Sequence, residues 1–235
     1  MATWLKNNSI QKLGGGFLER TGLALWSRLQ LAGLGAHKDP AVVKMLRQIH
    51  KDRRSLMSAF ELFNVYGVAR AQARRPGAFA EVGVYRGASA KLLCEVKGDK
   101  PLHLFDTFEG LPPASEHDRG VHKPGQFACS LEAVRAYLAG YANVHFHKGV
   151  FPESAADVPE MSYAFAHFDV DLYEGTLACL EYFYPRMIPG GIILSHDFDL
   201  LAGVNKAFSE FFADKPEAII EEPTTQCLVV KLDGR

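Results

Sequence analysis

From residue 78 onward, short apolar runs alternate with segments in which apolar residues recur at helical spacing. The runs predict strands over 78–84, 102–108, 144–149, 163–171 and 190–198. The segments between and after these runs predict helices over 88–96, 131–140, 175–187 and 203–215. Alternation of this kind is typical of a parallel sheet with helices on both faces.

Two shorter apolar runs, 217–222 and 226–232, follow the last helix and are joined by a tight link. A link this short cannot hold the crossover that parallel neighbours need, so the runs predict an antiparallel pair at one edge. The chain is therefore predicted to form an α/β Rossmann-like fold. Its sheet is expected to have seven strands, to be mostly parallel, and to end in an antiparallel edge strand.

Residues 1–75 have a different pattern and predict a helical extension ahead of a main domain at 76–235. Helices are expected over 17–35 and over 41–74, where apolar residues again recur at helical spacing. Basic clusters within this region are expected to be solvated helix faces.

The first of these helices has an apolar stripe that includes Leu25, Trp26 and Leu29. We expect this helix to pack on the main domain, and the alternatives are that it lies on a membrane surface or packs against a second copy. A homodimer is therefore one expectation for the assembly.

The composition limits the class of protein. The chain has 235 residues, of which 48% are hydrophobic and 23% charged, as expected for one globular core. A net charge of -1 gives no field that would attract nucleic acid or an anionic membrane. No apolar run approaches the roughly 20 residues that span a bilayer, and the N-terminus lacks the features of a signal peptide. Four isolated cysteines form no C-x-x-C pair, which favours reduced thiols in a cytoplasmic protein.

A glycine-rich turn follows the first predicted strand, with Gly83, Gly87 and Ser89 in the segment EVGVYRGAS. Glycines let the backbone turn sharply and approach a ligand, and the start of the next helix offers N–H groups to an anion. The G-x-x-x-G spacing differs from the G-x-G-x-x-G of dinucleotide-binding folds. The alternative is a turn that needs its glycines for packing alone.

Acidic residues stand where three other strands end. Asp106 ends the second strand, where an acid suits the hydroxyls of a ribose; the alternative is a solvated aspartate. Asp169 and Asp171 follow the fourth strand, and His196 and Asp197 follow the fifth. Because neighbouring strands end at one edge of the sheet, we expect these four side chains to converge.

Asp169, Asp197 and His196 are the expected ligands of one divalent cation, Mg²⁺ or Mn²⁺. Histidine is a poor ligand for Mg²⁺ and a better one for Mn²⁺, so His196 is alternatively a general base, as is Asp171. The competing interpretation is that the aspartates cap the turns or helices that follow.

Other polar segments allow more limited predictions. His145 and His147 alternate along one strand and are expected to be structural, and His167 is expected in the core. The polar insertion 109–130 contains three prolines and predicts a lid or binding loop; the alternative is a surface excursion.

The chain contains, in this order, the segments EVGVYRGASA, LHLFDTFEGLPP, KGVFPES, HFDVDLYEGTLACLEYFYPRMIPGG and SHDF. From about residue 55 to the end they resemble the macrocin O-methyltransferase family of S-adenosylmethionine (SAM)-dependent enzymes. The resemblance implies the class I methyltransferase fold and SAM as cofactor. It also implies transfer of a methyl group to hydroxyl groups, often on sugars of natural products.

The resemblance also implies roles for individual residues. Glu81, Gly83, Tyr85 and Ser89 are expected to line the methionine end of SAM, with Ser89 on its carboxylate. Gly87 belongs to the same cofactor-binding turn.

Further along the chain, Asp106 is expected to hold the ribose hydroxyls, with Phe108 nearby, and Val150 and Phe151 are expected at the adenine. For Asp169 and Asp197 the resemblance implies binding of the divalent cation, with Asp171 beside them. The family commonly has two acids where this chain has His196 and Asp197.

The sequence thus predicts a SAM-dependent O-methyltransferase assisted by a divalent cation. Its expected acceptor is a hydroxyl of a small molecule or glycan, most simply a sugar hydroxyl. The alternatives are a non-catalytic SAM-binding protein of the same fold and a nucleotide-dependent oxidoreductase.

Overall fold

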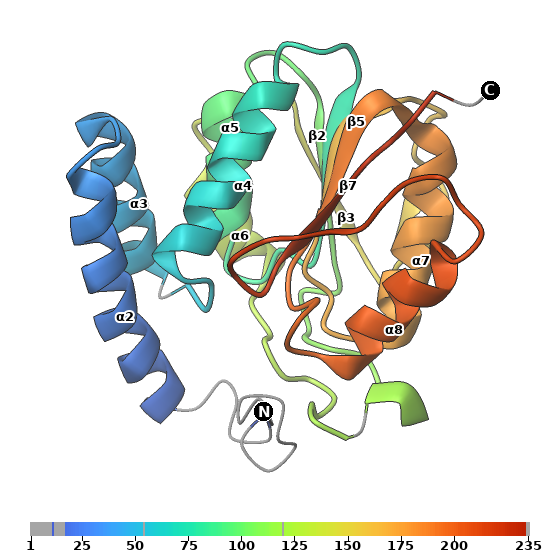
Figure 1. The fold of residues 1–235 in the computed structure, drawn as a ribbon, viewed down its shortest axis with the longest axis horizontal. Coiled ribbons are helices and arrows are strands. Elements are labelled where there is room, and N and C mark those ends of the chain that lie inside the picture. The colour runs from blue at the N-terminus through green and yellow to red at the C-terminus, as the bar shows by residue number, and fades with distance from the viewer. Residues whose placement is uncertain (1–10, 12–16, 54, 119, 234–235) are drawn as a thin grey trace.

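The computed structural model describes residues 11, 17–53, 55–118 and 120–233 (Figure 1). Its helices are α2 (Phe17–Gly35), α3 (Pro40–Arg53), α4 (Ala59–Gln72), α5 (Ala88–Val96), α6 (Leu131–Leu138), α7 (Tyr173–Phe183) and α8 (Ala202–Phe211). Its strands are β1 (Ala78–Val82), β2 (Leu102–Asp106), β3 (Val144–Lys148), β4 (Tyr163–Phe168), β5 (Met187–Ser195), β6 (Ile220–Glu221) and β7 (Cys227–Val230). Every strand and helix predicted from residue 78 onward is present.

The strands form one sheet in the order β3-β2-β1-β4-β5-β7-β6. The pairings from β3 across to β5 are parallel, whereas β7 runs antiparallel to both β5 and β6. The predicted antiparallel pair at one edge is confirmed, although the reversed strand β7 is the inner member of that pair. Strand order reverses between β1 and β4, which is where an open sheet of this kind binds ligands.

Helices cover both faces of the sheet and bury two apolar clusters (Figure 1). On one face, Phe79 of β1 meets Phe165 of β4 with ring centres 5.5 Å apart, under α4, α5 and α6. On the other face, Tyr163 of β4 meets Phe183 of α7 at 5.0 Å. Each large apolar side chain that is fully buried contributes roughly 1.5–3 kcal/mol, so these two layers hold the strand ends in place.

The helical region predicted over 41–74 is present, but it is divided into two helices, α3 and α4. The side chain of Ser58 accepts a hydrogen bond from the Glu61 N–H, and Oε2 of Glu61 accepts one from the Ser58 N–H at 2.7 Å. Ser58 has an extended backbone, so α4 begins after it. This reciprocal capping box, S-x-x-E in the sequence, was the available signal for a new helix start.

Helix α2 faces outward with the apolar stripe that was identified from the sequence. Leu25, Trp26 and Leu29 are 57%, 56% and 67% exposed, whereas Leu31 and Leu34 on the opposite side are buried. Helix α2 therefore packs on the domain as predicted, because Leu31 and Leu34 belong to the same apolar cluster as Phe79 of β1, but it does so with the side opposite to the stripe. Both sides of α2 carry apolar residues, and helical spacing identifies a face without showing which one is inward. Contact of the exposed face with a second copy stays a prediction.

Two further sequence expectations concern the membrane and the cysteines. No helix in the described part of the chain has the length and apolar character needed to cross a membrane. All four cysteines are free thiols, and Cys94, Cys179 and Cys227 are buried.

Three histidines pack together where β2 meets β3. His103 pairs in register with His145, with ring centres 4.9 Å apart, and its Nδ1 lies 3.0 Å from Nε2 of His147. Phe105 stacks on His147 at 4.6 Å. Burial, reinforced by the two neighbouring imidazoles, lowers the pKa of His103 to about 4. His103 is therefore a neutral part of the packing at pH 7.

We expect His103→Gln to make folding less sensitive to acid. The unfolded chain protonates this imidazole near its ordinary pKa of 6.5, but the folded chain does so only near 4. Stability is therefore lost as pH falls through that interval, with a slope of up to about 1.4 kcal/mol per pH unit. Thermal unfolding across the interval measures this loss. His37→Gln, at an exposed position, is the control; an equal acid response in the two variants would contradict the prediction.

Candidate functional site

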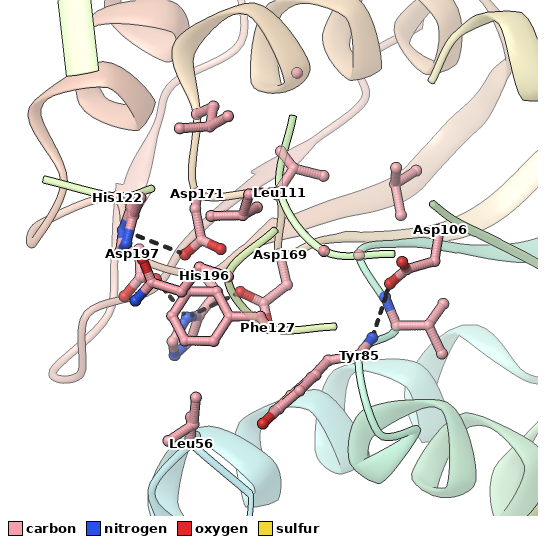
Figure 2. Close-up of a pocket in the computed structure, with 18 of the residues that line it drawn as sticks. Leu56, Tyr85, Asp106, Leu111, His122, Phe127, Asp169, Asp171, His196 and Asp197 are labelled. Carbon is pink, nitrogen blue, oxygen red and sulfur yellow. Dashed lines mark hydrogen bonds and ion pairs between the residues drawn. The ribbon is translucent and has the colours of Figure 1, made fainter. Parts of the chain in front are cut away.

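A cavity of about 820 Å³ opens at the carboxyl ends of β1, β2, β4 and β5. Its walls come from the turns after these strands, the insertion 109–130 and the N-terminal helices (Figure 2). Its volume is typical of sites for cofactors and small molecules, and it lies where the strand order reverses.

The glycine turn after β1 forms one wall of the cavity, with Gly83, Tyr85 and Ser89 in the lining. Gly83 has a φ of +85°, and a Cβ there would lie 1.9 Å from the carbonyl oxygen of Asp169. Only glycine therefore lets the turn after β1 meet the end of β4. Helix α5 begins just beyond the turn, so its first N–H groups are available to an anion at this wall.

Asp106 holds this turn in place. Its Oδ2 accepts hydrogen bonds from the N–H groups of Val84 and Tyr85 at 2.7 and 2.8 Å (Figure 2). Its Oδ1 accepts one from the Phe108 N–H at 2.6 Å. Oδ2 already accepts two hydrogen bonds, but Oδ1 can accept a second one, so contact with a ribose is compatible with this structural role and stays a prediction.

Three residues expected at the cofactor lie outside the cavity lining: Glu81, Gly87 and Phe108. Glu81 is fully buried with its Oε1 2.9 Å from Nδ1 of His167, which is itself buried as predicted. Burial raises the pKa of Glu81, and the contact with His167 opposes that shift. Phe108 packs in the apolar cluster under α4 to α6. Glu81 and Phe108 thus lie behind the cavity wall. The sequence could not show this, because a residue type that matches a family motif does not reveal the direction of its side chain.

Val150 and Phe151, expected at an adenine, do line the cavity after β3. Phe151 is buried and meets Phe105 edge-on with ring centres 5.3 Å apart, while Val150 is half exposed. An apolar wall of this kind suits a flat heterocycle.

The structure brings together the polar residues that follow β4 and β5. Asp169, His196 and Asp197 each offer one ligand atom, and these atoms lie within 4.8 Å of one another. Nδ1 of His196 is 3.2 Å from Oδ1 of Asp169 and 3.0 Å from Oδ2 of Asp197 (Figure 2). Asp171 lines the same cavity, with its Oδ1 3.9 Å from Nε2 of His122. The predicted convergence of the four side chains is thus present.

The donor set of this cluster fits a divalent cation. Both ring nitrogens of His196 are buried, yet neither makes a well-aligned hydrogen bond with any described residue. Buried ring nitrogens that face carboxylates without an aligned hydrogen bond are uncommon and call for an explanation such as an ion. Two carboxylates and one imidazole suit Mn²⁺, Fe²⁺ or Zn²⁺ better than Mg²⁺, which prefers oxygen ligands.

Negative charge is crowded around His196. Burial lowers the pKa of His196, but the carboxylates of Asp197, Asp169 and Glu61 outweigh it and hold that pKa well above its usual range. Burial and the charges of Asp169 and Asp197 raise the pKa of Asp171. A positive charge within the cluster, either a proton or a cation, therefore stabilises it.

Strained backbone accompanies the site. Tyr85, Phe127, Asp171 and Asp197 all line the cavity with φ between +47° and +63°. Such conformations cost about 1–3 kcal/mol each for residues with side chains, and they persist only where the surrounding packing imposes them.

Glu61 of α4 is a site residue that the sequence analysis missed. It lines the cavity, and its Oε2 lies 3.5 Å from Nε2 of His196. Its Oε1 accepts a hydrogen bond from Oγ1 of Thr225 at 2.8 Å. The capping-box spacing was the one local signal at Glu61, and it indicates a helix start rather than a site.

The insertion 109–130 forms the opposite wall. Leu111, His122 and Phe127 line the cavity, and the Leu111 N–H donates to the carbonyl of Gln126 at 2.8 Å (Figure 2). This hydrogen bond ties the two halves of the insertion together, and a role as a lid or binding loop stays a prediction.

Asp118 anchors the insertion to the domain. Its Oδ1 accepts a hydrogen bond from the Tyr173 N–H at 2.7 Å, at the start of α7, and its Oδ2 accepts from the Ser115 N–H at 2.8 Å. Gly203 leaves room for this contact, because a Cβ there would lie 2.2 Å from Oδ1 of Asp118.

This geometry can be compared with known proteins. A family model described as macrocin-O-methyltransferase (TylF) matches residues 64–227. The chain belongs to the TylF family. The family resemblance and the class I fold predicted from the sequence are therefore confirmed, and the oxidoreductase alternative has no support.

One curated relative of the chain is the 8-demethyl-8-(2,3-dimethoxy-alpha-L-rhamnosyl)-tetracenomycin-C 4'-O-methyltransferase of Streptomyces olivaceus. It is 32% identical over 139 residues, which cover 52% of this chain and 53% of the relative. The chain thus spans about half the length of the curated relatives it matches.

Solved structures show the same fold. The O-methyltransferase NovP has a TM-score of 0.69 at 21% identity, covering 92% of this chain and all of that one. The O-methyltransferase TomG of Streptomyces achromogenes, solved in complex with SAM, has a TM-score of 0.59 at 18% identity and covers 89% and 98% of the two chains.

We expect Gly83→Ala to disrupt this TylF-family site. The added Cβ would collide with the Asp169 carbonyl, so stability should fall by about 3 kcal/mol or more, measured by chemical denaturation. Gly98→Ala is the matched control, because Gly98 also has positive φ but has nothing within 4 Å of the new Cβ. It should lose only about 1–2 kcal/mol. Equal losses would show that the contact with Asp169 is unimportant.

We expect Asp118→Ala to release the insertion, because three hydrogen bonds to its carboxylate disappear. Hydrogen exchange of the backbone amides over 109–130 should accelerate by about tenfold or more, as expected for loss of more than about 1.4 kcal/mol of local stability. Exchange in β1 and β4 should stay as in the wild type. Glu116→Ala, at an exposed position in the same insertion, is the control. Unchanged exchange in Asp118→Ala would mean that other contacts hold the insertion.

Proposed function

We propose that this protein transfers the methyl group of SAM to a hydroxyl group of a glycosylated small molecule. The observation that carries the proposal is the Asp169–His196–Asp197 cluster, which shares one cavity with the glycine turn in a TylF-family fold. In a single cavity a cofactor and an acceptor can be held in line, and such proximity supplies much of the rate of a transfer reaction.

The proposed acceptor atom is a sugar hydroxyl. The tetracenomycin enzyme named above acts, by its name, on a compound in which a rhamnosyl group is attached to tetracenomycin C. The cavity of the present chain combines carboxylates with the apolar side chains of Leu56, Leu111 and Phe127. Polar groups of this kind suit a sugar, and the apolar wall suits the body to which the sugar is attached. A glycan without an apolar body is the second candidate.

Residues of the glycine turn are proposed to bind SAM. Gly83, Tyr85 and Ser89 would surround its methionine portion, with the start of α5 facing the carboxylate. Asp106 would hold the ribose, and Phe151 would lie against the adenine. When bound, SAM supplies a methyl group already activated by its sulfonium.

Asp169, Asp197 and His196 are proposed to hold a divalent cation, which would lower the pKa of a coordinated hydroxyl group. Asp171 is the proposed acceptor of the hydroxyl proton. Its carboxylate lines the cavity and contributes no atom to the group of three ligands. His196, the other predicted base, is already engaged between two aspartates. The insertion, anchored by Asp118, would exclude water from the reacting groups.

The proposal is tested by titrating S-adenosylhomocysteine into metal-free protein and into protein with Mn²⁺. Methyl transfer from labelled SAM is then assayed with a panel of rhamnosides and deoxysugar glycosides. Binding followed by cation-dependent transfer supports the proposal. Absence of binding would overturn it, whereas binding without transfer to any acceptor would favour the non-catalytic SAM-binding alternative.

Asp169→Asn and Asp197→Asn are expected to lower the methyl-transfer rate by about 100-fold or more, because each removes a ligand of the proposed cation. Affinity for S-adenosylhomocysteine in metal-free protein should stay close to the wild-type value. Asp157→Asn, an exposed aspartate after β3, is the control. Full activity in either cluster variant would refute the roles given to these carboxylates.

A further inference from the structure

We propose that Glu61 is a positioning residue that orients His196 for the cation and thereby raises the affinity of the cluster for it. This inference rests on the proposed cation site. Glu61 belongs to α4, in the N-terminal helices, and precedes the residues 64–227 that match the TylF family model. Its side chain nevertheless reaches the cavity at the end of β5.

The ring of His196 bridges Glu61 and the two aspartates. Nδ1 lies 3.2 Å from Asp169 and 3.0 Å from Asp197, whereas Nε2 lies 3.5 Å from Oε2 of Glu61. Nε2 is buried and makes no well-aligned hydrogen bond in the described part of the chain, so the carboxylate of Glu61 is the charge that faces it.

This arrangement selects one tautomer. A neutral imidazole that binds a cation through Nδ1 must carry its proton on Nε2. A carboxylate beside Nε2 stabilises that proton position and makes Nδ1 a stronger ligand. Metal-binding histidines very commonly have such a partner on the second nitrogen, and loss of the partner weakens metal binding.

Glu61 is itself held rigidly. Its Oε2 accepts from the Ser58 N–H at 2.7 Å, and its Oε1 accepts from Oγ1 of Thr225 at 2.8 Å. The carboxylate is thus fixed from two sides, by the start of α4 and by the segment before β7.

The competing explanation is that Glu61 only caps α4. Capping needs the hydrogen bond from Ser58, whereas the contacts with Thr225 and His196 belong to the site. Variants that change the capping hydroxyl of Ser58 and the carboxylate of Glu61 separately therefore distinguish the two roles.

The test is a titration of Mn²⁺ into the metal-free full chain. Binding is measured by calorimetry or from the paramagnetic resonance signal of free Mn²⁺. Glu61→Gln keeps the shape of the side chain but removes its charge, and it should weaken Mn²⁺ binding by about 10–100-fold. Affinity for S-adenosylhomocysteine without Mn²⁺ should be unchanged, which confirms an intact fold. Glu61→Asp withdraws the carboxylate from Nε2 by one methylene and should also weaken Mn²⁺ binding, so it decides the question should Glu61→Gln fail to fold.

Ser58→Ala is the matched control for capping. It should lower stability by about 1 kcal/mol while leaving the affinity for Mn²⁺ unchanged. Wild-type affinity for Mn²⁺ in Glu61→Gln would overturn the inference about Glu61 but not the proposed cation site. Equal losses of Mn²⁺ affinity in Glu61→Gln and Ser58→Ala would have the same meaning. Absence of Mn²⁺ binding in wild-type protein that still binds S-adenosylhomocysteine would overturn the cation site and this inference together.

Discussion

The crowding of carboxylates around one imidazole is the constraint on which the site depends. Asp169, Asp197 and Glu61 all lie within 3.5 Å of a ring nitrogen of His196, and Asp171 lines the same cavity. Buried carboxylates repel one another strongly unless a positive charge lies among them. The cluster is consequently a place where a cation or a proton is stabilised. That property is the one that the proposed activation of a hydroxyl group requires.

The packing around the cluster holds its carboxylates and imidazole in these positions. The turn after β1 touches the end of β4 so closely that only glycine fits at position 83. Asp171 and Asp197 adopt positive φ at the ends of β4 and β5. The apolar layers on both faces of the sheet hold these strand ends, and their burial offsets the strain at the site.

The N-terminal helices are part of this scaffold. Leu62 and Val65 of α4 are fully buried in the same apolar cluster as Phe79 of β1. From this position α4 places Glu61 at His196, while the insertion closes the cavity from the other side through Asp118. The cavity therefore brings together three segments that are far apart in the sequence. Variation in α4 or in the insertion can change the site while the strand ends stay the same.

The sequence by itself determined that the sheet is mostly parallel with an antiparallel edge. It also determined the glycine turn and the strand ends at which Asp169, Asp171, His196 and Asp197 stand. These features follow from local rules, because apolar periodicity identifies strands and the ends of neighbouring parallel strands meet at one edge. Only the tertiary structure decided that α2 turns Leu25, Trp26 and Leu29 outward, that Glu81 lies behind the cavity wall, and that Glu61 lies beside His196. Side-chain direction and contact between distant segments depend on how whole layers pack, and no local pattern of residues contains that information.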